Sequence, residues 1–198
     1  MDKLDLNTKA PELRERMGED VNSPVDIFSL ANQIDKLTIV YYPLGENISG
    51  MCVANEKVKL IAVNSTMSYG RQRFSLAHEF YHLYFDELSE FNVCSKKLDS
   101  TNEAEKNADQ FASYFLAPYK SLKALIKKIC GNEILSLHHI IALEQYFGMS
   151  HQAMLWRLVS EGYLTRRQLE EFSFGVMLTA RGLGYDEKLY RPSPLELQ

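Results

Sequence analysis

Residues 71–82 read RQRFSLAHEFYH, and the interpretation of the whole chain depends on them. Apolar residues recur at helical spacing over residues 69–86, so we expect one helix across that range. Within it, His78, Glu79 and His82 form an HExxH motif, which places the two histidines one turn apart on the same helix face. Both imidazoles can therefore reach one metal ion, and zinc is the ion that this motif typically binds.

A third zinc ligand is expected from the next predicted helix, because a catalytic zinc takes three protein ligands and leaves a position for water. Near the start of that helix, Glu103 has capping-box spacing from Ser100, which would explain it without a metal. Glu105 and Asp109 form an ExxxD pair that shares one helix face. We expect Glu105 to ligate the metal, with Glu103 as its main rival, and Asp109 to hold the second ring nitrogen of a ligand histidine.

This set of groups predicts hydrolysis of peptide bonds. Zinc would lower the pKa of water, and Glu79 would take the proton and return it to the leaving amine. A further donor would stabilise the developing oxyanion. The sequence does not choose among the candidates for that donor, which are Tyr81, Tyr114, Tyr119, His138, His139 and His151.

These residues resemble the ImmA/IrrE family of metallopeptidases, in which a motif of the type RxRFxLAHExxH precedes a helix that reads A-N-x-F-A and ends in L-x-P. The corresponding segments here are RQRFSLAHEFYH (71–82) and EKNADQFASYFLAP (105–118), and GMSHQAMLWRL (148–158) is similar to the family's downstream region. This chain differs at Tyr81, where many relatives have glycine, and at Asp109, where asparagine is common. The resemblance implies a zincin-like fold, a zinc cofactor and cleavage of a helix-turn-helix (XRE-type) repressor, usually encoded beside the protease on a mobile element or in a stress regulon.

Composition narrows the class of protein. Of 198 residues, 45% are hydrophobic and 24% charged, and no stretch approaches the roughly 20 apolar residues of a membrane span. The N-terminal segment lacks the apolar core of a secretory signal, and three widely spaced cysteines are typical of reduced thiols. A net charge of −4 does not favour nucleic acid. We expect a cytoplasmic protein with a protein substrate and no direct contact with membrane or nucleic acid.

The fold expected is α+β and zincin-like, with a small, mostly antiparallel sheet, the HExxH helix and a C-terminal helical segment. Residues 1–120 would form the metallopeptidase domain, and residues 121–198 would pack on it. Ser23 and Pro24 look like the start of a helix, and residues 87–99 like a polar loop. Strands are expected at residues 37–42, 51–54 and 57–64, and later helices near 100–118, 120–130, 135–147 and 151–161, before a less regular tail.

Two other functions stay open. Residues 142–158 have the spacing of a DNA-binding helix-turn-helix, although residues 132–172 hold only three arginines against five glutamates, and Arg157 is the one cation on the second helix. Alternatively, the metal could stabilise a non-catalytic module that binds another protein. Glu79 favours catalysis over that module, because a purely structural site has no use for a carboxylate beside the metal.

Overall fold

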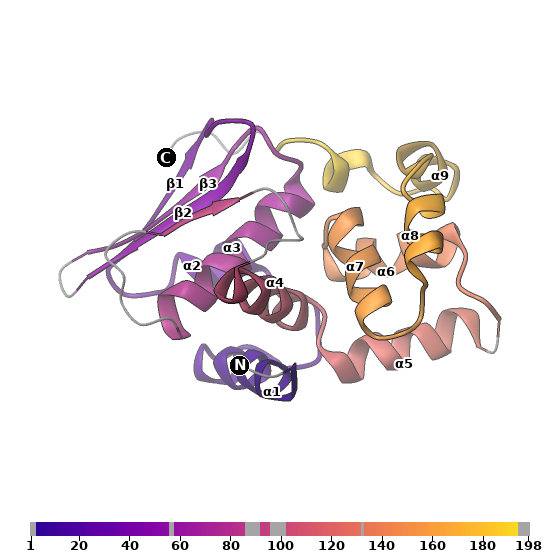
Figure 1. Cartoon of the computed structure of the whole chain (residues 1–198), viewed down its shortest axis with the longest axis horizontal. Helices are drawn as coiled ribbons and strands as arrows, with labels where there is room; N and C mark the ends of the chain where they lie inside the picture. Colours follow the sequence, from indigo (N-terminus) through magenta and orange to yellow (C-terminus); the bar gives the residue numbers. More distant parts are fainter. Residues whose placement is uncertain (1–2, 56–57, 86–91, 96–101, 132, 194–198) are drawn as a thin grey trace.

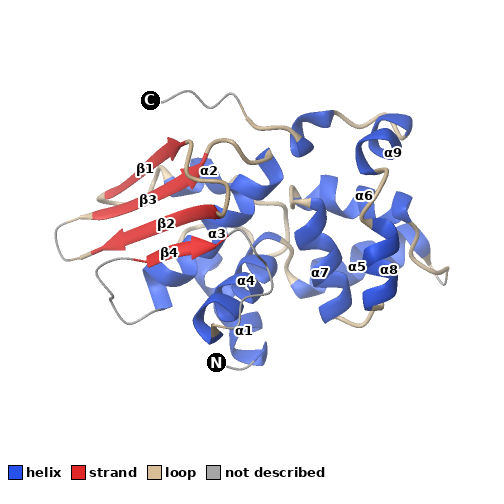
Figure 2. Cartoon of the chain, turned by 45° about the horizontal axis from the view of Figure 1, so that its top comes forward, coloured by secondary structure: helices blue, strands red, loops and turns tan. Residues whose placement is uncertain are grey.

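The chain folds into a small sheet with helices against one of its faces and a second group of helices at one end (Figures 1 and 2). The computed structural model describes residues 3–55, 58–85, 92–95, 102–131 and 133–193. Its architecture is the expected α+β class. No helix in the described part of the chain is long and apolar enough to cross a membrane.

The sheet has strand order β1-β3-β2-β4, formed by Leu37–Tyr42, Lys59–Asn64, Ile48–Ala54 and Asn92–Ser95 respectively. β2 pairs antiparallel with β3 and β4, whereas β1 and β3 are parallel, so the sheet is mostly antiparallel as expected. The β1–β2 connection must therefore cross the end of β3, where the buried Asn64 amide donates to the carbonyls of Leu44 (3.1 Å) and Ile48 (2.7 Å). The prediction of a loop over residues 87–99 is wrong at β4, which is the edge strand beside β2.

The HExxH helix is α3, Tyr69–Phe85, close to its predicted bounds. It lies under the sheet, and every residue from Gly70 to Leu83 is buried. At its start the backbone touches the C-terminal helices: a Cβ on Gly70 would lie 2.9 Å from the Ser150 nitrogen and 3.0 Å from Leu189 Cδ1. Only a glycine fits this contact without a shift.

Helix α4, Glu103–Leu116, packs beside α3 and carries the predicted acidic residues. Its N-cap is Asn102, whose side chain accepts a hydrogen bond from the Ala104 nitrogen at 3.0 Å. The prediction that Ser100 caps this helix through a capping box is therefore wrong, and Ser100 itself lies outside the described residues. The cause is that asparagine caps helices as well as serine does.

The N-terminal segment differs most from expectation. Helix α1, Lys3–Arg16, contains Pro11 and packs on α4, where its buried Arg14 donates to the Phe115 carbonyl at 3.0 Å. Helix α2, Ile27–Ala31, is capped by Asp26 and not by Ser23. The Asp26 carboxylate accepts from both the nitrogen and the hydroxyl of Ser29, so it satisfies the first turn better than Ser23 could.

The C-terminal helices form a separate group at one end of the molecule (Figure 1). α5, α6 and α7 match their predicted ranges, and the tail expected to be irregular contains three further helical elements. The chain then returns to α3, where the Tyr69 nitrogen donates to the Arg191 carbonyl at 2.7 Å. The bounds are Tyr119–Cys130 (α5), Leu137–Phe147 (α6), His151–Ser160 (α7), Arg166–Phe172 (α8), Val176–Gly182 (α9) and Glu187–Tyr190 (η1).

Candidate metal centre

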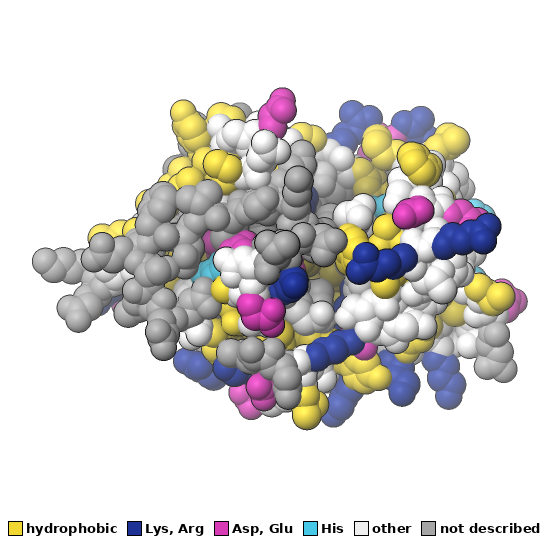
Figure 3. All heavy atoms as spheres, viewed as in Figure 1, with side chains coloured by type: hydrophobic (Ala, Val, Ile, Leu, Met, Phe, Trp, Pro, Cys, Tyr) yellow, Lys and Arg dark blue, Asp and Glu magenta, His cyan; other side chains and the backbone are white. Residues whose placement is uncertain are grey.

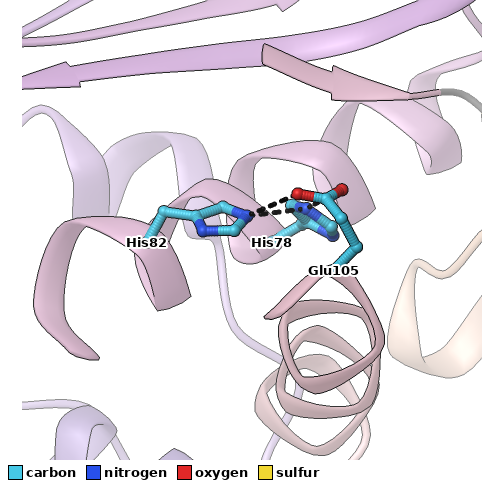
Figure 4. A group of neighbouring side chains, drawn as sticks. All are labelled: His78, His82 and Glu105. Atoms are coloured by element: carbon cyan, nitrogen blue, oxygen red, sulfur yellow. Dashed lines mark hydrogen bonds and ion pairs between the residues drawn. The ribbon is translucent and has the colours of Figure 1, made fainter. Parts of the chain in front are cut away.

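Helices α3 and α4 bring His78, His82 and Glu105 to one point (Figure 4). The two histidine Nε2 atoms are 3.1 Å apart. His78 Nε2 lies 3.4 Å from Glu105 Oε2, and His82 Nε2 lies 3.4 Å from Glu105 Oε1. One ligand atom from each residue falls within 4.8 Å of the others, which makes this a group that could hold a metal ion.

The spacing of these donor atoms fits a tetrahedral metal. Zinc–nitrogen distances of about 2.0–2.1 Å in tetrahedral geometry separate neighbouring donors by ~3.3 Å. The separations of 3.1 and 3.4 Å lie on either side of that value. Two imidazole nitrogens and a carboxylate are also the donor set of many catalytic zinc sites, which keep a further position open.

Asp109 contacts one of the histidines. Its Oδ1 lies 2.8 Å from His78 Nδ1, one helical turn after Glu105 on the same face of α4. When this carboxylate accepts the Nδ1 proton of a neutral His78, the Nε2 atom is the one left to bind a metal. The charge of Asp109 also reaches Arg71: burial lowers the pKa of Arg71, and Asp109 acts against that shift.

Glu105 faces the histidines, whereas Glu103 is exposed at the first residue of α4. Burial acts to raise the pKa of Glu105, but hydrogen bonds and charge from the two histidines outweigh it and lower that pKa to about 2. Glu105 is therefore ionised at neutral pH, as a metal-ligating carboxylate must be.

Glu79 is fully buried and lies against strand β2. A Cβ on Gly50 of β2 would come within 2.6 Å of Glu79 Oε1 and 3.1 Å of the Ala62 carbonyl oxygen. Gly50 thus leaves the space that the Glu79 carboxylate occupies. The sequence does not single out this residue, because no local pattern indicates a contact with a helix that begins 19 residues later.

The described residues place several of the proposed oxyanion donors in other interactions. Tyr81 is buried among aromatic rings, with Phe111 5.8 Å away between ring centres. The Tyr114 hydroxyl donates to Glu161 at 3.1 Å. His151 contacts the buried Glu144 carboxylate at 2.6 Å, and His139 caps the start of α6.

The α6–α7 pair has a left-handed Gly148 between its helices, as a helix-turn-helix does. However, Arg157 is 1% exposed, with Nε 3.1 Å from Glu161 Oε1 and NH1 donating to Ser113 Oγ at 3.1 Å. The one cation of α7 is therefore not presented to solvent, where a phosphate backbone would lie. Lysine side chains gather instead over α5, along the lower edge in Figure 3.

A family model described as the IrrE N-terminal-like domain of peptidase family M78 matches residues 35–159, or 125 of the 198 residues. The chain belongs to this IrrE-like peptidase family. The matched region includes the whole sheet, α3, α4 and both histidines of the motif, so the resemblance expected from residues 71–118 is confirmed.

Among solved structures, the IrrE-like chain is similar to a Mycobacterium tuberculosis transcriptional regulator, with a TM-score of 0.52 and 18% identity. The similarity covers 78% of this chain but 46% of the regulator, so the chain spans about half of that protein's length. At this identity the likeness concerns the fold. No curated protein matches the chain in sequence. The family and the grouped histidines and glutamate together support a metallopeptidase.

Proposed function

We propose that the chain is a zinc-dependent cytoplasmic endopeptidase whose substrate is a helix-turn-helix repressor. The observation that carries the proposal is the convergence of His78 Nε2, His82 Nε2 and the Glu105 carboxylate, with Glu79 buried next to His78 on the same helix. Membership of a peptidase family supports hydrolysis of peptide bonds. The repressor is what the family resemblance implies.

In the proposed mechanism, His78, His82 and Glu105 would hold zinc, which would supply a Lewis acid for the scissile carbonyl and for water. Glu79 accepts a proton from the attacking water and delivers it to the leaving amine nitrogen. Asp109 keeps His78 in one tautomer throughout.

The sheet offers a way to hold an extended substrate. β4 is at the edge of the sheet, next to β2, and β2 carries Gly50 against Glu79. A peptide that added to this edge by main-chain hydrogen bonds would be separated from β2, the strand that contacts Glu79, by β4 alone. This geometry suits cleavage within an unfolded or extended stretch of a protein.

A cleavage assay tests the proposal. The purified, zinc-loaded protein is mixed with the helix-turn-helix repressor encoded nearest its gene, beside Glu79→Gln and a chelated sample. Discrete fragments are expected from the zinc-loaded native chain alone, because Glu79→Gln keeps the shape of the side chain and loses the base. Intact repressor in every sample, with folded and zinc-loaded protein, would favour a non-catalytic zinc-stabilised module instead.

A further inference from the structure

A pocket of about 260 Å³ lies between α4 and α7 and begins at the carboxylate that holds His78. Asp109 contributes to its wall together with Phe74 of α3, which lies one turn before His78. The volume is below the roughly 300 Å³ at which pockets for small-molecule ligands begin. It suits a single side chain of a bound peptide, and Asp109 in its wall links it to His78 of the metal centre.

The pocket is lined by a buried guanidinium with an unused donor. Arg157 is 1% exposed, and its NH2 has no hydrogen-bond partner among the described residues. Its Nε, which also forms no hydrogen bond to any of those residues, lies 3.1 Å from Glu161 Oε1, its NH1 donates to Ser113 Oγ, and the centre of the Tyr114 ring lies 4.0 Å from its central carbon. These contacts fix the guanidinium in place, and leaving a buried donor unmet is costly unless a ligand or water satisfies it.

The charge around the pocket is positive. Glu161 offsets Arg157, but Glu161 also pairs with Lys3 at 3.5 Å, so this group of three carries a net positive charge. Lys106 adds a second cation at the rim, where it is exposed and forms no ion pair within the described part of the chain. Asp109 is the one acidic residue in the lining, and its carboxylate is already committed to His78 Nδ1 at 2.8 Å.

From this arrangement we propose that the pocket is a specificity site for an acidic side chain of the substrate, bound by Arg157 NH2 in its interior and Lys106 at its rim. The inference rests on the proposed peptidase function, because it assigns the pocket to one residue of the peptide being cleaved. An aspartate or glutamate there satisfies the unused donor and meets both cations, whereas a lysine or arginine meets like charge. Arg157 and Lys106 thus select the peptide and hold it in register with the metal centre.

The test uses a synthetic pool of randomised peptides with acetylated and amidated ends, so that only side chains carry carboxylates. In one arm, the zinc-loaded native chain cleaves the pool and the cleavage sites are read by mass spectrometry. In the other arm, zinc-loaded Glu79→Gln captures peptides from the same pool without turnover. Each arm is repeated with Lys106→Glu and with Lys123→Glu, which makes the same charge change at an exposed position of α5, outside the pocket.

We expect aspartate and glutamate to be enriched about tenfold over their amides at one fixed position, which is the range of a charge-assisted hydrogen bond. Lys106→Glu should abolish that preference and Lys123→Glu should leave it unchanged. Because Lys106 is exposed, its replacement does not threaten the fold. Arg157→Lys, with its thermal midpoint measured, should weaken the preference while retaining the positive charge.

The two arms separate the failure of the pocket from the failure of the proposed function. Capture of acidic peptides that depends on Lys106, without any cleavage, would refute the endopeptidase and retain the pocket. Cleavage with no acidic preference, or with a preference that Lys106→Glu does not change, would refute the pocket and retain the endopeptidase. The absence of both cleavage and acidic capture would refute both proposals.

Discussion

Replacing Gly50 with alanine should disable the proposed catalytic carboxylate while leaving the fold and the metal site intact. The added methyl would lie 2.6 Å from Glu79 Oε1, and ordinary contact begins at 3.4 Å, so the carboxylate must move by the difference of 0.8 Å. The backbone opposes the change little, because Gly50 is not among the glycines with positive φ. The atom that yields is the end of a side chain, so we expect a stability cost of about 1 kcal/mol.

The effect on catalysis should be much larger than the effect on stability. A displacement of about 1 Å in a reacting group can cost on the order of a hundredfold in rate, which corresponds to about 2.7 kcal/mol. We therefore expect kcat for cleavage of the repressor to fall roughly a hundredfold. The atoms nearest the new methyl belong to Glu79 and Ala62 and not to His78, His82 or Glu105, so zinc affinity should stay unchanged.

The assay compares the native chain, Gly50→Ala and Gly45→Ala for cleavage rate, zinc content and thermal midpoint. Gly45 is a matched control, because a Cβ there has nothing within 4 Å and its φ is also ordinary. An undiminished rate in Gly50→Ala would refute the claim that Gly50 positions Glu79. Loss of zinc together with activity would also refute it, since Gly50 would then act through the metal ligands.

Three further predictions concern stability. Chelation should lower the thermal midpoint and added zinc should restore it. At a hundredfold excess of zinc over Kd, the free energy of unfolding should rise by about 2.7 kcal/mol, and His82→Ala should show neither response. Arg73→Met should cost about 2 kcal/mol or more in chemical denaturation, because the buried side chain donates to the carbonyls of Gly148 at 2.8 Å and Val25 at 2.6 Å; a smaller loss would mean that water replaces it. Burial raises the pKa of Glu144 above 4.5, and Glu144 raises that of His151 above 6.5 although burial acts to lower it. The folded state then binds these protons more tightly than the unfolded state does. The free energy of unfolding should therefore fall as pH rises from 4.5 through the raised pKa of His151. Glu144→Gln should flatten this pH dependence, and an unchanged slope in that variant would contradict the prediction.

The parts of the site that follow helical spacing could be predicted from the sequence. His78 and His82 are four residues apart, and Glu105 and Asp109 are also four apart, so each pair faces one way as soon as its helix is recognised. The grouping of the two pairs required the expectation that a third ligand exists. The structure places Glu105 with the histidines and leaves Glu103 exposed.

Contacts between distant segments could not be predicted in this way. β4 was missed because a four-residue edge strand has too few residues to show alternation. The parallel pairing of β1 with β3 depends on a crossing held by Asn64, and a single asparagine carries no pairing signal. Helix α1 was not expected, and it continues past Pro11, a residue that usually ends a helical pattern.

The contact at Gly70 limits how this gene can recombine. Gly70 begins the helix that carries the histidines, and it fits against Ser150 and Leu189, which lie 80 and 119 residues later in the chain. A chimera that joined the first half of this protein to the last helices of a relative would inherit only one side of that fit. The two halves should therefore be inherited as a unit, and chimeras should fold only when position 70 and its two distant neighbours come from the same parent.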